Sequence, residues 1–374
     1  MKISLSKQDI TEKEIAAVNE VLLSNALSLG PKLPEFEEKV AAFVGAKFAV
    51  AVNSGTSALH LCVRALDIGE GDEVITTPFS FIASANCMIF EKAKPVFVDI
   101  EPDTLNIDVN KIEQAITPNT KAILPVHVFG LPANMKKISL LAEKYNLAVI
   151  EDSCEALGAK YENKFAGTIG DCGTFAFYPN KQITTGEGGM LVTNREDIAQ
   201  LARSMRNQGR DDGMGWLAHA RLGFNYRISD INCALGIAQI ERVEEILSMR
   251  ESVAKKYNDL LKNELPEILP LCDAPKNSTR SWFVYVVRLP ERYSATLRDE
   301  VIKKLRASGI WCNNYFPPIH LQPFYVEKFG YKKGDFPITE SVSEKTIALP
   351  FYNKLSDDDI EAVVRELKKI LSDL

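Results

Sequence analysis

The segment GTFAFYPNKQITTGEGGM, residues 173–190, has the pattern that decides the fold of this chain. Its first part, residues 173–177, is apolar and β-prone, and predicts a buried strand. Pro179 and Asn180 end this strand, and the glycine-rich run GEGG precedes the next apolar run. Lys181 is therefore framed by a strand end and a glycine loop. A lysine on an exposed helix needs no such frame, so Lys181 is a candidate functional residue.

Short β-rich runs alternate with helix-compatible segments along the first two hundred residues. Strands are predicted at residues 48–52, 73–76, 95–100, 122–126, 147–151, 173–177 and 189–193. Helices are predicted between most of them, at residues 56–66, 82–90, 110–115, 135–145 and 196–205. This alternation predicts an α/β fold with a mostly parallel, seven-stranded sheet that carries helices on both faces.

The pattern changes after Gly209. We expect an irregular loop at residues 210–230 and one long helix at 231–261, followed by a smaller α+β unit. In that unit, strands are predicted at 282–289 and 311–315, and helices at 296–308 and 356–374. The sequence thus predicts a large domain at residues 1–250 and a small C-terminal domain at 251–374. Whether the N-terminal helix, residues 9–23, packs on the small domain is left open.

Composition excludes several classes of protein. The net charge is −6 and the charged residues are interspersed, so no basic face suggests nucleic acid. The N-terminus lacks the apolar core of a signal peptide, and no apolar run approaches the roughly 18 residues of a membrane span. The seven cysteines are an odd number without C-x-x-C spacing. We therefore expect a cytoplasmic protein with reduced thiols, no metal site and no membrane contact.

Two motifs at predicted strand ends could bind a ligand. Residues 53–57, NSGTS, place glycine and hydroxyl residues at a helix N-terminus, where free amides attract anions. A plain helix cap would have the same residues. Residues 77–81, TPFSF, place an aromatic ring where it could stack on a flat ligand. Two core phenylalanines are the alternative interpretation.

Two further motifs carry charge. Residues 151–155, EDSCE, follow an apolar strand, and a buried carboxylate there needs a partner such as a protonated pyridine nitrogen. A helix cap by Asp152 is the alternative. The amine of Lys181 can form a Schiff base with a carbonyl cofactor, unless it is a solvated surface lysine. Pyridoxal 5′-phosphate (PLP) needs a lysine, a carboxylate, an aromatic ring and phosphate donors, so the four motifs together predict a PLP site.

The segments NSGTSAL, TTPFSFIAS, IEDSCEALGA, FAFYPNKQITTGEGG and RLGFNYRISDINCALG resemble the DegT/StrS nucleotide-sugar aminotransferases. That family consists of PLP-dependent enzymes of the aspartate-aminotransferase fold, also called fold type I. The resemblance covers nearly the whole chain. It implies a homodimer whose active sites lie at the subunit interface.

The resemblance also implies roles for individual residues. Lys181 is expected to form the Schiff base and to shuttle a proton, and Asp152 to pair with the pyridine nitrogen. The other cofactor contacts are expected from Gly55 and Thr56 at the phosphate, Phe81 on the ring, Glu155 at the ring hydroxyl, and Asn225 and Arg227 of the second subunit. Further candidates for substrate contact are His320, His127 and Glu187.

The chain departs from the family pattern at Ala176. Many members have a serine there, five residues before the lysine, and its hydroxyl binds the phosphate. A net hydrogen bond contributes roughly 0.5–1.5 kcal/mol, so we expect PLP to bind somewhat less tightly here.

The expected reaction is transfer of an amino group from L-glutamate to a keto-sugar nucleotide. A transaminase of a cyclic polyol ketone remains an alternative. A sugar dehydratase of the same family is disfavoured because those enzymes replace the lysine with histidine. A non-catalytic regulator on this fold is disfavoured by the intact Lys181 and Asp152. No G-x-G-x-x-G follows a strand, which disfavours a nicotinamide oxidoreductase.

Overall fold

The computed structural model describes residues 2–215 and 217–374. Its main sheet has seven strands in the order β1-β9-β8-β5-β4-β2-β3. The bounds are β1 Phe48–Val52, β2 Glu73–Thr76, β3 Lys94–Phe97, β4 Thr120–Ile123, β5 Ala148–Asp152, β8 Cys172–Ala176 and β9 Gly189–Thr193. Strands β8, β5, β4, β2 and β3 pair in parallel, and β9 is antiparallel to both of its neighbours. The predicted mostly parallel sheet is confirmed.

Helices cover both faces of this sheet, because alternate residues of each strand point to opposite sides. In β1, Val50 and Val52 belong to one buried cluster, while Ala49 and Ala51 belong to another. The first cluster includes residues of α3 Gly55–Ala65, α4 Ala83–Ile89 and α7 Glu196–Arg206. The opposite face is covered by α2 Lys32–Val44, α8 Asp230–Ile240, α5 Val109–Ala115 and α6 Met135–Tyr145.

The single long helix expected at 231–261 is wrong, because the chain forms two helices there. Helix α8 ends at Ile240, and α9 runs from Val243 to Glu264. Arg242, at the break, donates to the buried carboxylates of Glu14 at 2.8 Å and Asp9 at 3.1 Å. The break therefore coincides with a long-range ion pair, which local helix-forming patterns do not reveal.

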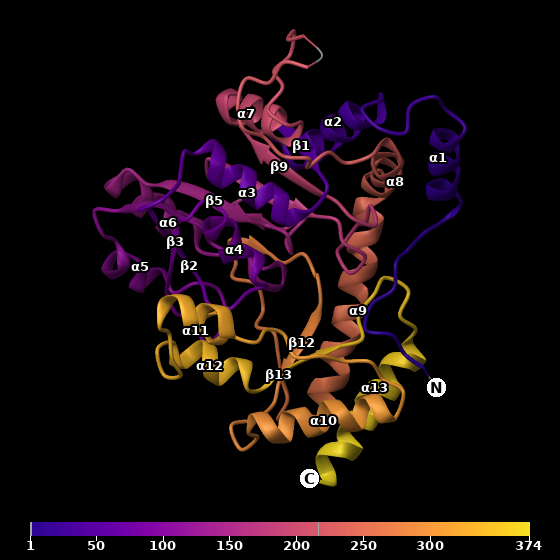
Figure 1. Cartoon of the computed structure of the whole chain (residues 1–374). Helices are drawn as coiled ribbons and strands as arrows, with labels where there is room; N and C mark the ends of the chain where they lie inside the picture. Colours follow the sequence, from indigo (N-terminus) through magenta and orange to yellow (C-terminus); the bar gives the residue numbers. More distant parts are fainter. Residues whose placement is uncertain (1, 216) are drawn as a thin grey trace.

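The N-terminal segment contacts both parts of the chain. Helix α1, Glu12–Leu22, packs against α8 (Figure 1). The residues before it reach the C-terminal part, where the Ile3 amide donates to the Gly309 carbonyl at 2.9 Å. Helix α9 connects the two parts and continues through residue 250. The domain boundary expected at residue 250 therefore stays a prediction.

The C-terminal part is built on a second, antiparallel sheet of β10, β12 and β13. Figure 1 shows it below the main sheet, beside the lower half of α9. Its strands are β10 Leu269–Pro270, β12 Tyr285–Arg288 and β13 Thr346–Leu349. Its helices are α10 Ala295–Ala307, α11 Pro323–Phe329, α12 Pro337–Ser343 and α13 Asp357–Ser372. The short 3₁₀ helix η2, Ile319–Leu321, precedes α11. This arrangement confirms the smaller α+β unit.

Two details of that unit differ from the prediction. The strand expected at 311–315 is wrong, because Ile310 and Asn313 form isolated bridges to Ile3 and Ala348. A small sheet was also not expected, and it joins β6 Lys160–Tyr161 and β7 Lys164–Phe165 to β11 Ser278–Thr279. Such pairings between distant short segments leave little trace in the sequence.

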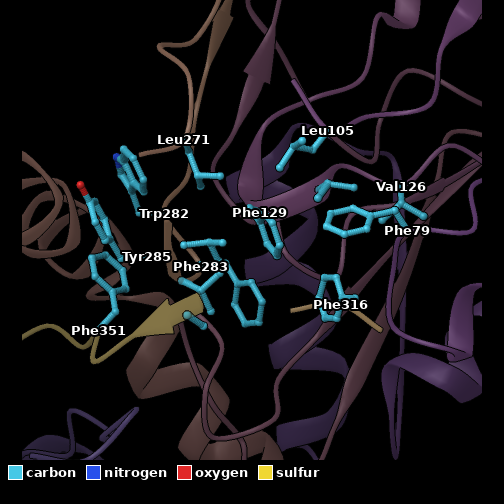
Figure 2. Packing of buried hydrophobic residues seen from close by; sticks show 14 of the residues in the cluster. Phe79, Leu105, Val126, Phe129, Leu271, Trp282, Phe283, Tyr285, Phe316 and Phe351 are labelled. Atoms are coloured by element: carbon cyan, nitrogen blue, oxygen red, sulfur yellow. The ribbon is translucent and has the colours of Figure 1, made fainter. Parts of the chain in front are cut away.

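One buried aromatic cluster joins the two parts of the fold. Figure 2 shows Phe129, Phe283 and Phe316 in its middle. Phe79 and Val126 lie on one side of them, and Trp282, Tyr285 and Phe351 lie on the other. The rings of Phe129 and Phe316 stack with centroids 5.3 Å apart. The segment around Phe283 is therefore fixed against the main sheet.

Candidate active site

The four sequence motifs emerge at one edge of the main sheet. Strands β2, β5 and β8 run in the same direction, and β1 shares it because β1 and β8 are both antiparallel to β9. The carboxyl ends of these strands therefore meet at one edge, where open α/β sheets bind ligands. The segments that follow β1, β2 and β8 carry Thr56, Phe81 and Lys181, and Asp152 is the last residue of β5.

The amine of Lys181 lies between a carboxylate and an aromatic face. Its Nζ is 4.0 Å from Oε1 of Glu155 and 3.9 Å from the centroid of the Phe283 ring. The side chain is 13% exposed, so the surface-lysine interpretation is wrong. Phe283 comes from the C-terminal part of the chain and was missed by sequence reasoning, because its position next to Lys181 depends on tertiary packing.

The residue after the lysine fixes the loop. The side-chain amide of Gln182 donates to the Glu155 carbonyl at 2.7 Å and to the Ser281 hydroxyl at 3.0 Å. Two residues before Phe283, Ser281 also donates its amide to the Gly130 carbonyl at 2.9 Å. These bonds hold the lysine loop and the Phe283 segment in one arrangement.

Glu155, the carboxylate next to Lys181, is buried. Its Oε2 accepts a hydrogen bond from the Phe129 amide at 2.9 Å. Burial raises the pKa of Glu155 to about 7, although the charge of Lys181 and the Phe129 amide act in the opposite direction. This carboxyl group can therefore exchange a proton near neutral pH.

Asp152 is held by two donors. Its Oδ1 accepts from the Cys154 amide at 3.1 Å, and its Oδ2 accepts from the Ser84 hydroxyl at 2.7 Å. Ser84 in turn bonds Ser80 at 2.7 Å. Sequence reasoning missed Ser84, although the spacing of four residues between the two serines is a signal that they share one side of a helical turn.

Glu151 and His127 form a buried structural pair. Nε2 of His127 lies 3.0 Å from Oε2 of Glu151, and Nδ1 of His127 accepts from the Ala133 amide at 3.1 Å. Both ring nitrogens are thus engaged, and His127 is fully buried. Glu151 also accepts three backbone amides, from Gly167, Ile169 and Gly170. The two acidic residues that begin EDSCE therefore differ in role. Glu151 holds the loop at residues 167–170, whereas Asp152 ends β5 at the edge of the sheet where the candidate site lies.

The N-terminus of α3 lies beside β8. A Cβ atom on Gly55 would be 2.7 Å from the Cβ of Ala176 and 3.0 Å from Sγ of Cys154, so only glycine permits this approach. Ser54 accepts from the Ser57 amide at 3.1 Å. The helix itself supplies no acceptor for the amides of Gly55 and Thr56, because they belong to its first turn. These amides are available to an anion.

The two phenylalanines of TPFSF, Phe79 and Phe81, differ in solvent exposure. Phe79 is fully buried and packs edge-on against Phe129 and Phe316. Phe81 is 62% exposed. The core interpretation therefore holds for Phe79, whereas the ring of Phe81 is free to stack on a ligand.

Three further candidates from the sequence are Asn225, Arg227 and Glu187. Asn225 is exposed, and its carbonyl accepts from the side chain of Asn53 at 3.3 Å. Arg227 donates to the Asn207 side chain at 3.1 Å. Glu187 is exposed in the glycine loop.

His320 is fully buried in the C-terminal part. Its Nε2 lies 3.0 Å from Oε1 of Glu340, and its ring packs edge-on against Phe336 with centroids 4.7 Å apart. Burial lowers the pKa of His320, opposed by the Glu340 carboxylate. His320, a candidate for substrate contact, is therefore a buried side chain paired with Glu340.

The donor set fits PLP. An amine, a held carboxylate, an exposed aromatic ring and open helix amides meet at one sheet edge, and the Gly55 contact brings the amides close to β8. Within residues 2–215 and 217–374, no group of three or more His, Cys, Asp or Glu side chains is placed to hold a metal ion. In the same residues, no helix is both long and apolar enough to cross a membrane.

Comparisons with known proteins identify the family of this chain. The model of the DegT/DnrJ/EryC1/StrS aminotransferase family matches residues 8–368. A GDP-perosamine synthase from Caulobacter vibrioides is 42% identical over 344 residues, covering 92% of this chain and 91% of that protein.

Two solved structures superpose over the whole chain. One is the aminotransferase PseC of Helicobacter pylori, involved in the biosynthesis of pseudoaminic acid, with a TM-score of 0.94, 29% identity and 100% of both chains covered. The other is the PLP form of Spr1654 from Streptococcus pneumoniae, with a TM-score of 0.93, 28% identity, and 100% and 99% of the two chains covered. The chain belongs to the DegT/DnrJ/EryC1/StrS aminotransferase family and is a PLP-dependent aminotransferase.

Proposed function

We propose that this enzyme transfers the amino group of L-glutamate to a keto-sugar nucleotide and so makes an amino sugar. The observation that carries the proposal is the buried amine of Lys181, 4.0 Å from Glu155, at the edge of the sheet that also carries Asp152. The sugar-nucleotide acceptor is supported by the names of two relatives, a GDP-perosamine synthase and an aminotransferase of pseudoaminic acid biosynthesis.

Each part of the cofactor has a proposed partner in this chain. The amides of Gly55 and Thr56 would bind the phosphate, because a helix N-terminus attracts anions. The exposed ring of Phe81 would cover one face of the pyridine ring. Asp152 would hold the proton on the pyridine nitrogen, since an ionised carboxylate stabilises a cation next to it. When bound, PLP supplies an aldehyde for amines and a ring that withdraws electrons.

Lys181 is proposed to move the proton in the reaction. A free amine at this position would take a proton from the substrate carbon as a general base and would give it to the cofactor carbon as a general acid. The ring face of Phe283 at 3.9 Å would stabilise the protonated amine. Glu155, which titrates near neutral pH, would sit beside the ring hydroxyl of PLP and adjust the charge around the amine.

A homodimer is part of this proposal. Asn225 is exposed although its backbone is fixed against Asn53 at the start of α3. An exposed amide and the Arg227 guanidinium on such a fixed segment could reach the phosphate or substrate of a second copy. Sedimentation of the holoenzyme would test this part, and a monomer with full activity would contradict it.

The test is a panel of acceptors assayed with L-glutamate while cofactor absorbance is followed. The panel contains keto-sugar nucleotides and a cyclic polyol ketone. We expect glutamate to shift the absorbance and a keto-sugar nucleotide to restore it, and Lys181→Ala to abolish both changes. The control is Lys164→Ala, an exposed lysine in β7.

Restoration by the cyclic polyol ketone alone would favour the alternative acceptor. Undiminished turnover by Lys181→Ala would contradict the proposed role of the lysine. A wild-type protein that holds PLP but responds to neither glutamate nor any acceptor would favour a non-catalytic regulator.

A further inference from the structure

Tyr226 lies between the two residues proposed to reach a second subunit, and its backbone is fixed on both sides. Its amide donates to the Arg206 carbonyl at 3.0 Å, and its carbonyl accepts from the Asn53 amide at 2.9 Å. Asn53 is the residue before the Ser54 cap of α3. The segment 225–227 is therefore attached to the chain at the entrance of the proposed phosphate site.

The side chain of Tyr226 makes a second connection to the same helix. Its hydroxyl lies 2.9 Å from Nδ1 of His60, a residue of α3 that is 3% exposed. The Tyr226 ring also stacks on Phe224 with centroids 4.8 Å apart. Backbone and side chain thus hold Tyr226 to both the start and the middle of α3.

His60 also bonds Glu91, which lies just after the end of α4. Its Nε2 lies 2.6 Å from Oε1 of Glu91, and Oε2 of Glu91 accepts from Arg64 at 2.8 Å. Burial lowers the pKa of His60, opposed by the Glu91 carboxylate. In its neutral form, the ring donates to Glu91 through Nε2 and accepts a hydrogen bond from the Tyr226 hydroxyl at Nδ1.

Glu91 follows α4, the helix that carries Ser84 and is preceded by Phe81. The chain of hydrogen bonds from Tyr226 through His60 to Glu91 therefore connects three segments that are proposed to contact PLP, the last of them in the site of a second copy of the chain. These are the N-terminus of α3, the segment with Phe81 and Ser84, and the segment 225–227. Both ring nitrogens of the buried His60 are satisfied in this way, and their partners lie on two other segments that are proposed to contact the cofactor.

We propose that Tyr226, His60 and Glu91 are positioning residues that hold these three segments in register for PLP. The inference rests on the proposed phosphate site at α3, and extends it to residues that do not touch the cofactor. Its consequence is that loss of the Tyr226 hydroxyl weakens PLP binding at a distance.

The experiment measures the Kd of PLP for the apoprotein at one fixed protein concentration. Tyr226→Phe removes the hydroxyl and keeps the ring that stacks on Phe224. We expect its Kd for PLP to rise about fivefold, the effect of one net hydrogen bond.

The matched control is Tyr257→Phe. Tyr257 is fully buried, and its hydroxyl donates to the Pro350 carbonyl at 2.9 Å in the C-terminal part. This variant loses a similar hydrogen bond away from α3 and α4, so its Kd for PLP should change less than about twofold. If Tyr226→Phe does not fold, His60→Gln reports the same connection, since the glutamine amide can replace Nε2 but not Nδ1.

Thr56→Pro separates failure of this inference from failure of the proposed site, because it removes the Thr56 amide hydrogen in the first turn of α3, where proline is tolerated. A weaker Kd for Thr56→Pro together with an unchanged Kd for Tyr226→Phe would overturn the positioning role and leave the phosphate site intact. Equal weakening by Tyr226→Phe and Tyr257→Phe would also overturn it, because it would show a general loss of stability. An unchanged Kd for Thr56→Pro would remove the phosphate site, and the inference with it.

Discussion

The amine of Lys181 lies 4.0 Å from a carboxylate oxygen of Glu155, and both side chains are largely buried. Burial of a carboxylate favours its protonated form, and here it raises the pKa of Glu155 to about 7 even though a cation lies nearby. The protonation of Glu155 is therefore linked both to the folding of the protein and to the charge around the lysine.

The first prediction concerns Glu155→Gln in the apoprotein. The pKa of Glu155 is raised in the folded state, so its contribution to stability is fully present below about pH 4.5 and is lost as the pH rises through about 7. The free energy of unfolding of the wild type, relative to Glu155→Gln, should fall by up to about 3 kcal/mol over this range. Urea unfolding of both proteins at a series of pH values measures it. A constant difference between the two proteins would contradict the raised pKa.

The second prediction concerns Ser84→Ala. This change removes the donor 2.7 Å from Oδ2 of Asp152. A hydrogen bond to a charged group contributes about 1.5–3 kcal/mol, so we expect kcat to fall about tenfold or more while PLP remains bound. Steady-state kinetics check it. Ser252→Ala is the control, because that hydroxyl bonds a carbonyl on the exposed side of α9. Equal effects of the two variants would mean that Ser84 does not act through Asp152.

The third prediction concerns Ala176→Ser. Ala176 adjoins Gly55 at the N-terminus of α3, so a hydroxyl there would face the proposed phosphate site. One added net hydrogen bond should lower the Kd for PLP about two- to tenfold. Equilibrium dialysis of the apoprotein gives the value, with the exposed Ala307→Ser as the control. A Kd that is unchanged or higher would place the phosphate elsewhere.

The fourth prediction concerns Arg242→Met. The change leaves the buried carboxylates of Asp9 and Glu14 without their arginine partner. Breaking a buried ion pair in this way costs about 3–5 kcal/mol of unfolding free energy. The control Arg195→Met breaks partly exposed ion pairs with Asp171 and Asp197 and should cost about 1 kcal/mol or less. Urea unfolding that shows equal losses for the two variants would contradict the structural role of Arg242.

The sequence predicted the main sheet because its strands are buried runs of apolar residues between turn signals. It also placed the four site motifs at strand ends, and parallel strands bring such ends to one edge without any knowledge of packing. This is why Lys181, Asp152, Phe81 and Thr56 could be grouped before their positions were known.

Contacts between distant segments could not be predicted. Phe283 lies under Lys181 because Gln182 bonds Ser281, and nothing local to either segment records that bond. The break between α8 and α9 coincides with the ion pairs of Arg242, in a stretch without proline or glycine. Likewise, the role of Glu151 became clear only from the three amides that it accepts.

The central claim is that Lys181 is the lysine that binds PLP covalently. Borohydride reduction of the holoenzyme fixes the cofactor to whichever lysine it is joined to, and peptide mapping by mass spectrometry then identifies that residue. The structure predicts a single labelled peptide that carries the added mass on Lys181. A label on any other lysine, or a PLP-loaded protein without a label, would contradict the claim.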